Sequence, residues 1–467
     1  MLCLGDSIRH DHPAMQPYLT AIEQAQSLSD LVVATWTLAQ YISVEVVEAV
    51  LAQRAQSPMS WPHCPQCGKR LHSKGFVKRE MATLVGVVRW RRRVGRCPAG
   101  CAIGQIAPFD ATLGLMPHQR ASLELQALGC AFAVFVPFAT AAHFVSWCSG
   151  VSASSWAVWQ WVQAAGKEAM KRLEYQLEAL EAGVEPEVEP MAPELAEVPL
   201  ALSGDGVMVP LRPHAGRPEG KIQWREVKVG VLARLRSYRN RHGKGVTRLA
   251  QRRLVAVLGE IDDFKVRFWF EALRQGIRST QTVVWLSDGG RGFWGLYEDL
   301  LRGYGQGILD FYHAAQNLWK GASAWLDGRT KQARQWFGCA RHWLRHGHLD
   351  NVLGDLSEAL EVETLPEHTR ETLEKVHAYL VRHHDHLDYA TYKELGLPLG
   401  SGMVESACKW LIQQRFKGVG MRWSEDGFNH LLHLRLAWVN GTFQTLFEPI
   451  ATGSGASDTL PQIASPN

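Results

Sequence analysis

Three short strings, far apart in the chain, each place one carboxylate among glycines and other small residues. They are Leu-Ser-Gly-Asp-Gly (202–206), Val-Val-Trp-Leu-Ser-Asp-Gly-Gly (283–290) and Gly-Ser-Gly-Met-Val-Glu-Ser-Ala (400–407). Asp205 and Asp288 each end an apolar run typical of a buried strand, whereas Glu405 opens an amphipathic helical stretch. The three could converge on divalent metal, as phosphoryl transfer with two metal ions requires. Taken singly, Asp-Gly after a strand is also the commonest hairpin turn.

The order of predicted elements after residue 198 is that of an α/β domain. Apolar, β-branched runs predict strands at 198–203, 226–233, 253–258, 282–287 and 307–310, with helices around 262–275 and 290–302. Residues from about 314 to 396 have a helical pattern rich in Trp and His. We therefore expect one domain over 198–450 that carries a helical insertion at about 314–396.

The residues before 198 are expected to form smaller units in a chain of 467 residues. The Ser-Gly-Val-Ser-Ala-Ser break at 149–154 suits a helix-turn-helix, although charge-poor, Trp-rich helices are also typical of a plain core. Glu181–Glu197 contains six Glu and three Pro and predicts a linker. We expect a helical segment at 1–60, a β-rich unit at 61–112, helices at 113–182, an acidic Pro-rich linker at 183–197, and a disordered Gly/Ser/Pro-rich tail at 451–467.

Two close pairs of cysteines in the β-rich unit predict a zinc ribbon. Cys64 and Cys67 flank Pro-Gln, and Cys97 and Cys101 flank Pro-Ala-Gly, so each pair sits on a turn that aims both sulfurs at one point. Four thiolates suit tetrahedral zinc. A redox pair or buried structural cysteines are the alternatives.

Basic residues are concentrated at two places, although the net charge of the chain is only +4. Residues 61–105 hold ten Lys/Arg against one acid, a local net charge of +9 that predicts contact with a polyanion. The Arg91, Arg92 and Arg93 run would lie on the ribbon hairpin. A second group follows Glu405 without an intervening acid, which suits a phosphate backbone, and a solvated helix face is the plainer alternative: Lys409, Arg415, Lys417 and Arg422.

Two further polar groups have ordinary explanations. Asp310 and His313 lie three apart at the end of a short strand, where an Asp N-cap and a satisfied core histidine would suffice. The run His383-His384-Asp385-His386 has a metal-like composition, but consecutive side chains point in different directions. We interpret that run as a solvated face.

The compartment is expected to be the cytoplasm, with the protein associated with the nucleoid. Nine cysteines is an odd number, and the chain does not start with the basic and apolar regions of a signal peptide. Residues 125–166 lack Asp, Glu, Lys and Arg, but Pro137, His143 and Gln160 interrupt this run, which therefore predicts buried helices. No membrane partner is expected.

Taken together, five strings resemble those of a bacterial insertion-sequence transposase of the ISKra type, allied to the Mutator-like transposases. Besides the strings around Asp205 and Glu405, they are Arg-Glu-Val-Lys-Val-Gly-Val (225–231), Ser-Asp-Gly (287–289) and Leu-Asp-Phe-Tyr-His-Ala-Ala (309–315). The resemblance covers roughly residues 60 to 450. It implies an RNase H-like catalytic domain with a helical insertion before the glutamate.

The resemblance also implies chemistry and partners. Asp205, Asp288 and Glu405 would be the catalytic triad that holds two Mg²⁺ or Mn²⁺ ions, and Asp310 and His313 would match a signature that follows the second aspartate. The protein would bind the terminal inverted repeats of a mobile element and cut and rejoin double-stranded DNA, as a homo-oligomer on element ends and target. The alternatives are a domesticated DNA-binding protein that no longer cuts and a structure-selective RNase H-like nuclease.

Overall fold

The computed structural model describes residues 13–57, 60–213, 220–239, 241–243 and 245–448. Their contacts divide the chain into two compact units, which we describe separately. The first comprises the residues up to Ala165 together with those from Phe443 on, and the second is Gly166–Thr442. The tail that we expect to be disordered, 451–467, lies outside the described residues.

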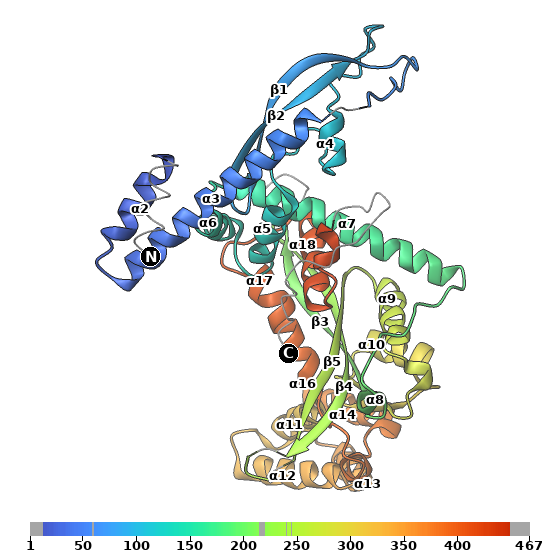
Figure 1. Cartoon of the computed structure of the whole chain (residues 1–467). Coiled ribbons are helices and arrows are strands. Elements are labelled where there is room, and N and C mark those ends of the chain that lie inside the picture. Colours follow the sequence, from blue (N-terminus) through green and yellow to red (C-terminus); the bar gives the residue numbers. More distant parts are fainter. Residues whose placement is uncertain (1–12, 58–59, 214–219, 240, 244, 449–467) are drawn as a thin grey trace. The chain divides into compact units, whose positions relative to one another are not determined.

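The first unit begins with helices and a two-stranded hairpin (Figure 1). The elements are η1 (Pro13–Met15), α2 (Gln16–Glu23), α3 (Leu28–Gln56), β1 (His72–Thr83), β2 (Gly86–Arg96) and α4 (Pro108–Thr112). The long helix α3 starts at a capping box, because Ser27 and Asp30 exchange side-chain and backbone hydrogen bonds. β1 and β2 are antiparallel with Glu80 opposite Arg89, and α3 contacts β2.

Three helices follow: α5 (Leu123–Phe135) and α6 (Phe138–Ser149), which are poor in charge, and α7 (Ser155–Glu181), which carries charged residues from Lys167 on and runs on into the second unit. α6 ends at Gly150, whose left-handed φ of 67° terminates the helix. Trp161 of α7 packs against Gly129 of α5, where an added Cβ would lie 2.7 Å from the indole ring. A short helix, η6 (Gln444–Phe447), contacts α5.

The second unit is built on a mixed five-stranded sheet of order β5-β4-β3-β6-β7. Its strands are β3 (Leu200–Leu211), β4 (Gln223–Arg239), β5 (Gly245–Leu258), β6 (Val283–Ser287) and β7 (Gln306–Leu309). β3, β4 and β5 form an antiparallel meander, and β6 and β7 add to β3 in parallel. The α/β class that the sequence predicts is therefore confirmed.

Three strands extend beyond their predicted ends. β3 continues through Asp205 to Leu211, with Val207, Val209 and Leu211 buried, so the expectation that Asp205 ends its strand is wrong. Gly206 pairs with Lys228 in the ladder, which rules out a hairpin turn at this Asp-Gly. The apolar run of β3 ends early in the sequence because Gly204 and Gly206 interrupt it, but the backbone hydrogen bonds between β3 and β4 continue beyond them. β4 and β5 likewise extend as a polar hairpin.

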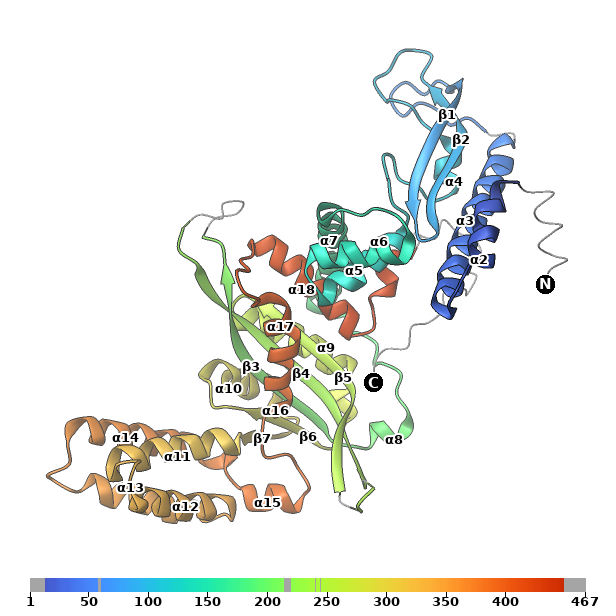
Figure 2. The same ribbon diagram turned by 90° about the vertical axis from the view of Figure 1, so that its left-hand side faces the viewer.

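Helices cover both faces of the sheet and come from several parts of the chain (Figure 2). Those between the strands are α9 (Ile261–Arg274), η2 (Ile277–Ser279), α10 (Arg291–Leu296) and the π-helical turn η3 (Tyr297–Leu301). Gly204 of β3 faces Phe293 of α10, where an added Cβ would lie only 2.6 Å from the ring. The next residue, Asp205, therefore points to the opposite face, where α16 (Gly402–Ala407) contacts β3 and β4.

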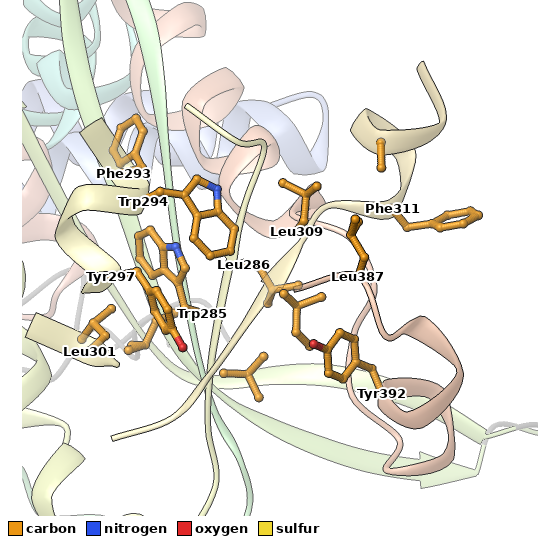
Figure 3. Packing of buried hydrophobic residues seen from close by; sticks show 14 of the residues in the cluster. Trp285, Leu286, Phe293, Trp294, Tyr297, Leu301, Leu309, Phe311, Leu387 and Tyr392 are labelled. Atoms are coloured by element: carbon orange, nitrogen blue, oxygen red, sulfur yellow. The ribbon is translucent and has the colours of Figure 1, made fainter. Parts of the chain in front are cut away.

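A helical block lies between β7 and α16. It contains α11 (Phe311–Leu326), α12 (Lys331–Arg345), α13 (Leu349–Leu360), α14 (Glu367–Arg382), η4 (His384–His386) and α15 (Tyr389–Glu394), and Figure 2 shows it as a bundle beside the sheet. In Figure 3, Trp285, Trp294 and Tyr297 pack on one side of Leu286, while Phe311 and Tyr392 of the block lie on the other. One buried core therefore joins the sheet and the block.

The chain after α16 continues into a π-helical turn, η5 (Cys408–Gln413), and the helices α17 (Gln414–Phe416) and α18 (Glu425–Val439). Before the sheet, the acidic segment expected as a linker contains the short helix α8 (Pro193–Ala196). Glu189 in this segment is buried and binds Arg253, with Nε at 2.7 Å, as well as Arg274. These ion pairs attach the segment to β5 and α9.

Candidate metal centres and nucleic-acid surfaces

Three aspartates lie at one level across the central strands. The parallel registers pair Ser203 with Leu286 and Ser287 with Leu309. Continuing these registers places Asp205 of β3 level with Asp288, directly after β6, and Asp288 level with Asp310, directly after β7. Residues at one level of a parallel sheet project to the same side. The sheet therefore brings together carboxylates that are 83 and 22 positions apart in sequence.

Asp205 lies half-buried on the face covered by α16 and η5. Its Oδ1 accepts a hydrogen bond of 2.7 Å from the backbone N–H of Gly206, and the Cys408 thiol lies 3.8 Å from Oδ2. Burial raises the pKa of Asp205, and the negative charges of Asp288 and Glu405 raise it further, whereas the Gly206 N–H lowers it. Asp288 and Glu405 are therefore each close enough to repel the Asp205 carboxylate.

Asp288 is held in a tight turn that the helical block supports. Its Oδ1 accepts a hydrogen bond of 3.0 Å from the Gly290 N–H, and its carbonyl accepts one of 3.1 Å from the Tyr379 hydroxyl of α14. Gly289 has a φ of 94°, and an added Cβ there would lie 2.8 Å from the Tyr379 ring. Burial raises the pKa of Tyr379, as do the charges of Asp288 and Asp310, so this hydroxyl stays protonated and donates.

Asp310 is buried, and its carboxylate accepts four hydrogen bonds from other groups of the protein. Oδ1 accepts the backbone N–H groups of Tyr312 and His313, at 2.7 and 2.9 Å, and so caps α11. Oδ2 accepts the N–H and the hydroxyl of Ser401, at 2.5 and 2.7 Å. A carboxylate offers about four acceptor sites. Asp310 therefore joins the start of α11 to the loop that begins α16.

Glu405 on α16 faces His313 on α11. The His313 Nε2 lies 3.5 Å from Oε1 of Glu405, and both side chains are partly exposed. His313 is therefore not the core histidine that the plainer interpretation of its sequence predicts.

These side chains could bind a metal ion. Ligand atoms of Asp310, His313 and Glu405 all lie within 4.8 Å of one another, a spacing that ligands of one cation can have. A cation bound at Asp310 would displace one of its four donors, whereas Glu405, Asp205 and Asp288 keep acceptor sites. Carboxylate oxygens suit hard divalent cations, and a cation would relieve the repulsion that raises the pKa of Asp205.

The helix that carries Glu405 becomes irregular at Cys408, three residues after the glutamate. At η5 the backbone makes a π-helical turn, and the buried guanidinium of Arg435 on α18 donates to the carbonyls of Trp410 and Leu411, at 2.8 and 3.0 Å. Burial lowers the pKa of Arg435 to about 9. These bonds satisfy carbonyls in the irregular turn, and so fix how α16 approaches the sheet.

The four cysteines of the ribbon are brought together as predicted. Sulfur atoms of Cys64, Cys67, Cys97 and Cys101 lie within 4.8 Å of one another, and Cys67 Sγ is 3.4 Å from Cys97 Sγ. Four sulfurs about 2.3 Å from one zinc ion would be separated by roughly 3.8 Å. Every cysteine of the described residues is a free thiol. The group could therefore bind zinc.

Backbone N–H groups favour a thiolate at Cys97, whereas hydrogen bonds with the Cys67 and Cys97 sulfurs, together with burial, raise the pKa of Cys101 to about 12. Burial opposes ionisation of Cys97, but hydrogen bonds from the N–H groups of Cys101 and Ala99 and from the Cys67 thiol lower the pKa of Cys97 to about 6. Gly68, with a φ of 69°, and Gly100, with a φ of 74°, make the two turns.

The arginine run of the ribbon is only partly free for a partner. Arg91 is exposed, whereas Arg92 donates to Asp110, with Nε 3.2 Å from Oδ2. Arg93 lies over the ring of Phe76, with its guanidinium carbon 5.1 Å from the centroid. Local charge counts miss this pairing because Asp110 lies beyond the basic segment in sequence.

The basic residues after Glu405 also differ in exposure. Lys409, Lys417 and Arg422 are exposed, but Arg415 is buried, with only 2% of its surface accessible. Its guanidinium lies over Trp423 at 5.3 Å, and burial lowers the pKa of Arg415 to about 10. A side chain so enclosed cannot reach a phosphate, and we omit Arg415 from the DNA surface proposed below.

A basic surface that our sequence analysis overlooked lies on the outer hairpin of β4 and β5. From 227 to 259 the chain holds nine Lys/Arg and no acid. Arg236 pairs directly with Arg248 across the two strands, and both are exposed. Like charges directly opposite one another destabilise a sheet, so the pair favours a bound anion. Arg239, Arg241 and Arg252 are exposed nearby.

The histidine run beside α14 is not a solvated face, and that interpretation is wrong for two of its members. His383 is buried, and Nδ1 of His386 donates a hydrogen bond of 3.1 Å to the Gly307 carbonyl. Their rings lie 5.0 and 4.3 Å from that of Trp294. His384 and Asp385 do face solvent. The chain therefore turns the first and last of the four side chains toward the core and the middle two toward solvent.

Comparisons with known proteins add little to this geometry. The chain matches no protein-family model and no curated protein. Among solved structures it is similar to the Drosophila P element transposase strand transfer complex, at 9% identity over 70% of this chain and 94% of that one, with a TM-score of 0.32. This TM-score is too low to establish a shared fold, so the interpretation depends on the site itself.

Proposed function

We propose that the protein is a DNA transposase of the ISKra insertion-sequence type, which binds the terminal inverted repeats of its element and cuts and rejoins DNA with divalent metal. The observation that supports the proposal is the placement of Asp288 and Glu405 around Asp205. Asp205 and Asp288 share one level of the sheet, and burial raises the pKa of Asp205, with the charges of Asp288 and Glu405 raising it further.

The strand order supports this proposal. An antiparallel meander whose first strand is central, extended by two parallel strands, is the order expected of an RNase H-like domain. In such a domain the first aspartate lies on the first strand, as Asp205 does on β3. A helical block precedes the helix of Glu405, as the resemblance implies.

The roles of the side chains follow from their surroundings. When two Mg²⁺ or Mn²⁺ ions are bound, they would activate the attacking water or 3′-hydroxyl and stabilise the departing 3′-oxygen. Asp205, Asp288 and Glu405 would supply the oxygens that hold them. Asp310 would position α11 and α16 through its four hydrogen bonds, and His313 would orient Glu405.

DNA would be held by basic residues around this site and on the outer hairpin. Near Glu405 these are Lys409, Lys417 and Arg422, and on the hairpin Arg236 and Arg248. On β4, Val229 pairs with Asp205 and so marks the level of the metal site. Arg236 lies seven positions further along the strand, or about 24 Å away at 3.4 Å per residue. A duplex contacted at both places would span about seven base pairs or more.

The other modules would contribute to recognition of the element ends. The ribbon would bind phosphates through exposed basic residues such as Arg91, with its fold fixed by zinc on the four cysteines. The pair α6 and α7 is the candidate for reading base edges as a helix-turn-helix. The protein would act as a homo-oligomer on two ends and a target, in the cytoplasm at the nucleoid.

The test is cleavage of labelled DNA that carries the sequences flanking this gene, with Mg²⁺ or Mn²⁺. We expect metal-dependent nicking and joining by the wild type, and loss of both in Asp205→Asn, Asp288→Asn and Glu405→Gln with DNA binding retained. Asp385→Asn, an exposed acid of the same unit, is the matched control and should cut normally.

Two other results would replace the proposal. Binding of the element ends without cleavage under either metal would identify a domesticated DNA-binding protein. Cleavage of branched DNA with no joining of ends would identify a structure-selective nuclease.

A further inference from the structure

The exposed side of α12, in the helical block, carries cations that no acid neutralises. From 329 to 349 the chain holds five Lys/Arg and three His but no Asp or Glu. Within the described residues, none of the four Lys/Arg on the helix itself forms an ion pair with a carboxylate. These four residues, which we call the basic face of α12, are Lys331, Arg334, Arg341 and Arg345.

The helical period brings the four cations onto one side of α12. At roughly 100° per residue they lie within an arc of about 80°. The opposite side of the helix holds Ala333, Ala340 and Leu344, which are buried. Gly338 lies within the arc of the basic face, and a Cβ added to it would meet no atom of another element within 4 Å. The middle of the face is therefore open to a partner.

Most of these cations occupy positions that are unfavourable in the protein alone. Lys331 and Arg334 are among the first four residues of α12, where the helix dipole disfavours positive charge and no acid is present. Arg341 and Arg345 are one turn apart, a spacing at which like charges repel each other. Only Arg345, in the last turn, lies at the favourable end of the dipole. A polyanion along the face would relieve the repulsion.

One end of the basic face lies beside the candidate metal centre. The guanidinium carbons of Arg341 and Arg345 are 5.5 and 5.4 Å from the ring centroid of Phe311, which directly follows Asp310. Because α11 and α12 are in contact and only four residues join them, α12 runs back along α11 toward the sheet (Figure 2). From Arg345 to Lys331 the face therefore leads away from the metal centre for about 21 Å at 1.5 Å per residue.

We propose that the basic face of α12 binds the phosphate backbone of duplex DNA that passes the metal centre, an inference that rests on the proposed function. At 3.4 Å per base pair the face would cover about six base pairs. It adds a contact surface on the helical block to those near Glu405 and on the outer hairpin. Phosphate contacts carry no sequence information, so the face would hold element ends, flanking DNA and target DNA alike.

Duplex DNA fits the basic face better than a single strand or an acidic protein does. Proteins hold single strands by stacking bases on exposed aromatic rings. The aromatic residues of α12, however, pack against the buried core of the unit: Trp336, Phe337 and Trp343. Trp336 also donates a hydrogen bond of 2.8 Å to Asp355 of α13. An acidic protein could satisfy the charges, but the position of the face beside carboxylates suited to phosphoryl transfer favours DNA.

Duplex binding by the full chain, measured by fluorescence anisotropy over a series of salt concentrations, tests the proposal. Lys331→Gln, Arg334→Gln and Arg341→Gln combined should raise the Kd on the order of 100-fold at about 0.1 M salt. The slope of log Kd against log salt concentration should fall by about three, because three phosphate contacts are lost. The loss should be the same for element ends and for unrelated sequence.

A matched control removes three exposed cations of the same unit that already pair with glutamates. These are Arg278→Gln, Arg302→Gln and Lys375→Gln, combined in one chain. The control has the same number of cations removed as the test variant, and its salt slope should equal that of the wild type. Circular dichroism and Mn²⁺ binding should be unchanged in both variants, so that a misfolded chain is not scored.

Cys339 provides an independent measure of where the DNA lies. Its thiol is free and exposed, directly after Gly338 at the edge of the basic face. The wild type labelled with a photoreactive azidophenacyl group should cross-link to duplex DNA, and Cys339→Ala should remove this cross-link. On DNA that the protein cuts, the cross-linked position should lie within about six base pairs of the cleaved phosphate, the length of the face.

The outcomes separate this inference from the proposed function. A triple variant that binds duplex DNA with the Kd and salt slope of the wild type would overturn the inference while the metal centre stands. Weakened duplex binding in a chain that never cuts would support the inference and refute the transposase.

Four other results would also overturn the inference. They are a wild type that does not bind duplex DNA, an equal loss in the matched control, a loss confined to single-stranded DNA, and no cross-link from Cys339 in DNA-bound protein. Polyglutamate that binds the wild type more tightly than duplex DNA does, and that the triple variant no longer binds, would assign the face to an acidic protein instead.

Discussion

Asp310→Asn should loosen the loop that begins α16 while leaving the cap of α11 in place. The asparagine oxygen can still accept the N–H groups of Tyr312 and His313. Its amide nitrogen would take the place of Oδ2 and face the backbone N–H of Ser401. This buried N–H would then lose its hydrogen bond to a charged acceptor, which contributes about 1.5–3 kcal/mol. Rotation of the Ser401 hydroxyl would recover part of this. The free energy needed to open the loop should therefore decrease by about 2 kcal/mol.

Amide hydrogen exchange measured by mass spectrometry reports the opening of each segment separately. A cost of about 2 kcal/mol corresponds to roughly 30-fold faster exchange. We expect this acceleration in peptides covering 399–404, with little change at 311–316. Asp385→Asn, whose carboxylate is exposed, should change neither. Unchanged exchange at 399–404 in Asp310→Asn would refute the argument that Asp310 holds this loop.

Three further outcomes follow from the structure. Cys97→Ser should release the ribbon zinc and make 61–105 sensitive to protease, while the melting of the sheet unit is retained; zinc analysis and limited proteolysis check this. Arg236→Ala combined with Arg248→Ala should weaken DNA binding and flatten its slope against log salt concentration by about 2. Burial lowers the pKa of His383 to about 4, below the value of 6.5 in the unfolded chain. Between these two pH values the unfolded state therefore binds more protons than the folded state, and the protein becomes less stable as the pH decreases. His383 should contribute about 2 kcal/mol to the drop in the free energy of unfolding between pH 7.5 and pH 5, and His383→Phe should lose that share in urea titrations, while the share of the likewise buried His433 remains.

Much of the second unit can be predicted from its sequence because local patterns decide it. Apolar β-branched runs bounded by Gly, Asp and Ser gave strands in the right order, since such runs must be buried and the boundaries cannot continue them. The pairing of Asp205 with Asp288 in space could be anticipated, because each follows buried residues of its strand. The cysteine pairs were predictable for the same reason, since each turn fixes two sulfurs.

What the sequence does not reveal is which charges are buried or already paired. Arg415 belongs to a group of basic residues in the sequence, yet it is buried and its guanidinium lies over the ring of Trp423. Asp310 resembles Asp288, but the four donors around it come partly from Ser401, which is 91 positions away. Such partners are set by tertiary packing, which local periodicity does not encode. The glycines at 204 and 206 likewise end the apolar pattern of β3, although its backbone hydrogen bonds to β4 continue to Leu211.

The central claim is that Asp205, Asp288 and Glu405 hold divalent metal together. Mn²⁺ binding to the full chain, measured by electron paramagnetic resonance, tests it most directly. We expect binding by the wild type that is strongly weakened in Asp205→Asn, Asp288→Asn and Glu405→Gln, and largely retained in Asp310→Asn. Binding that survives Asp205→Asn and Asp288→Asn but is lost in Asp310→Asn would contradict the account and assign the metal to Asp310.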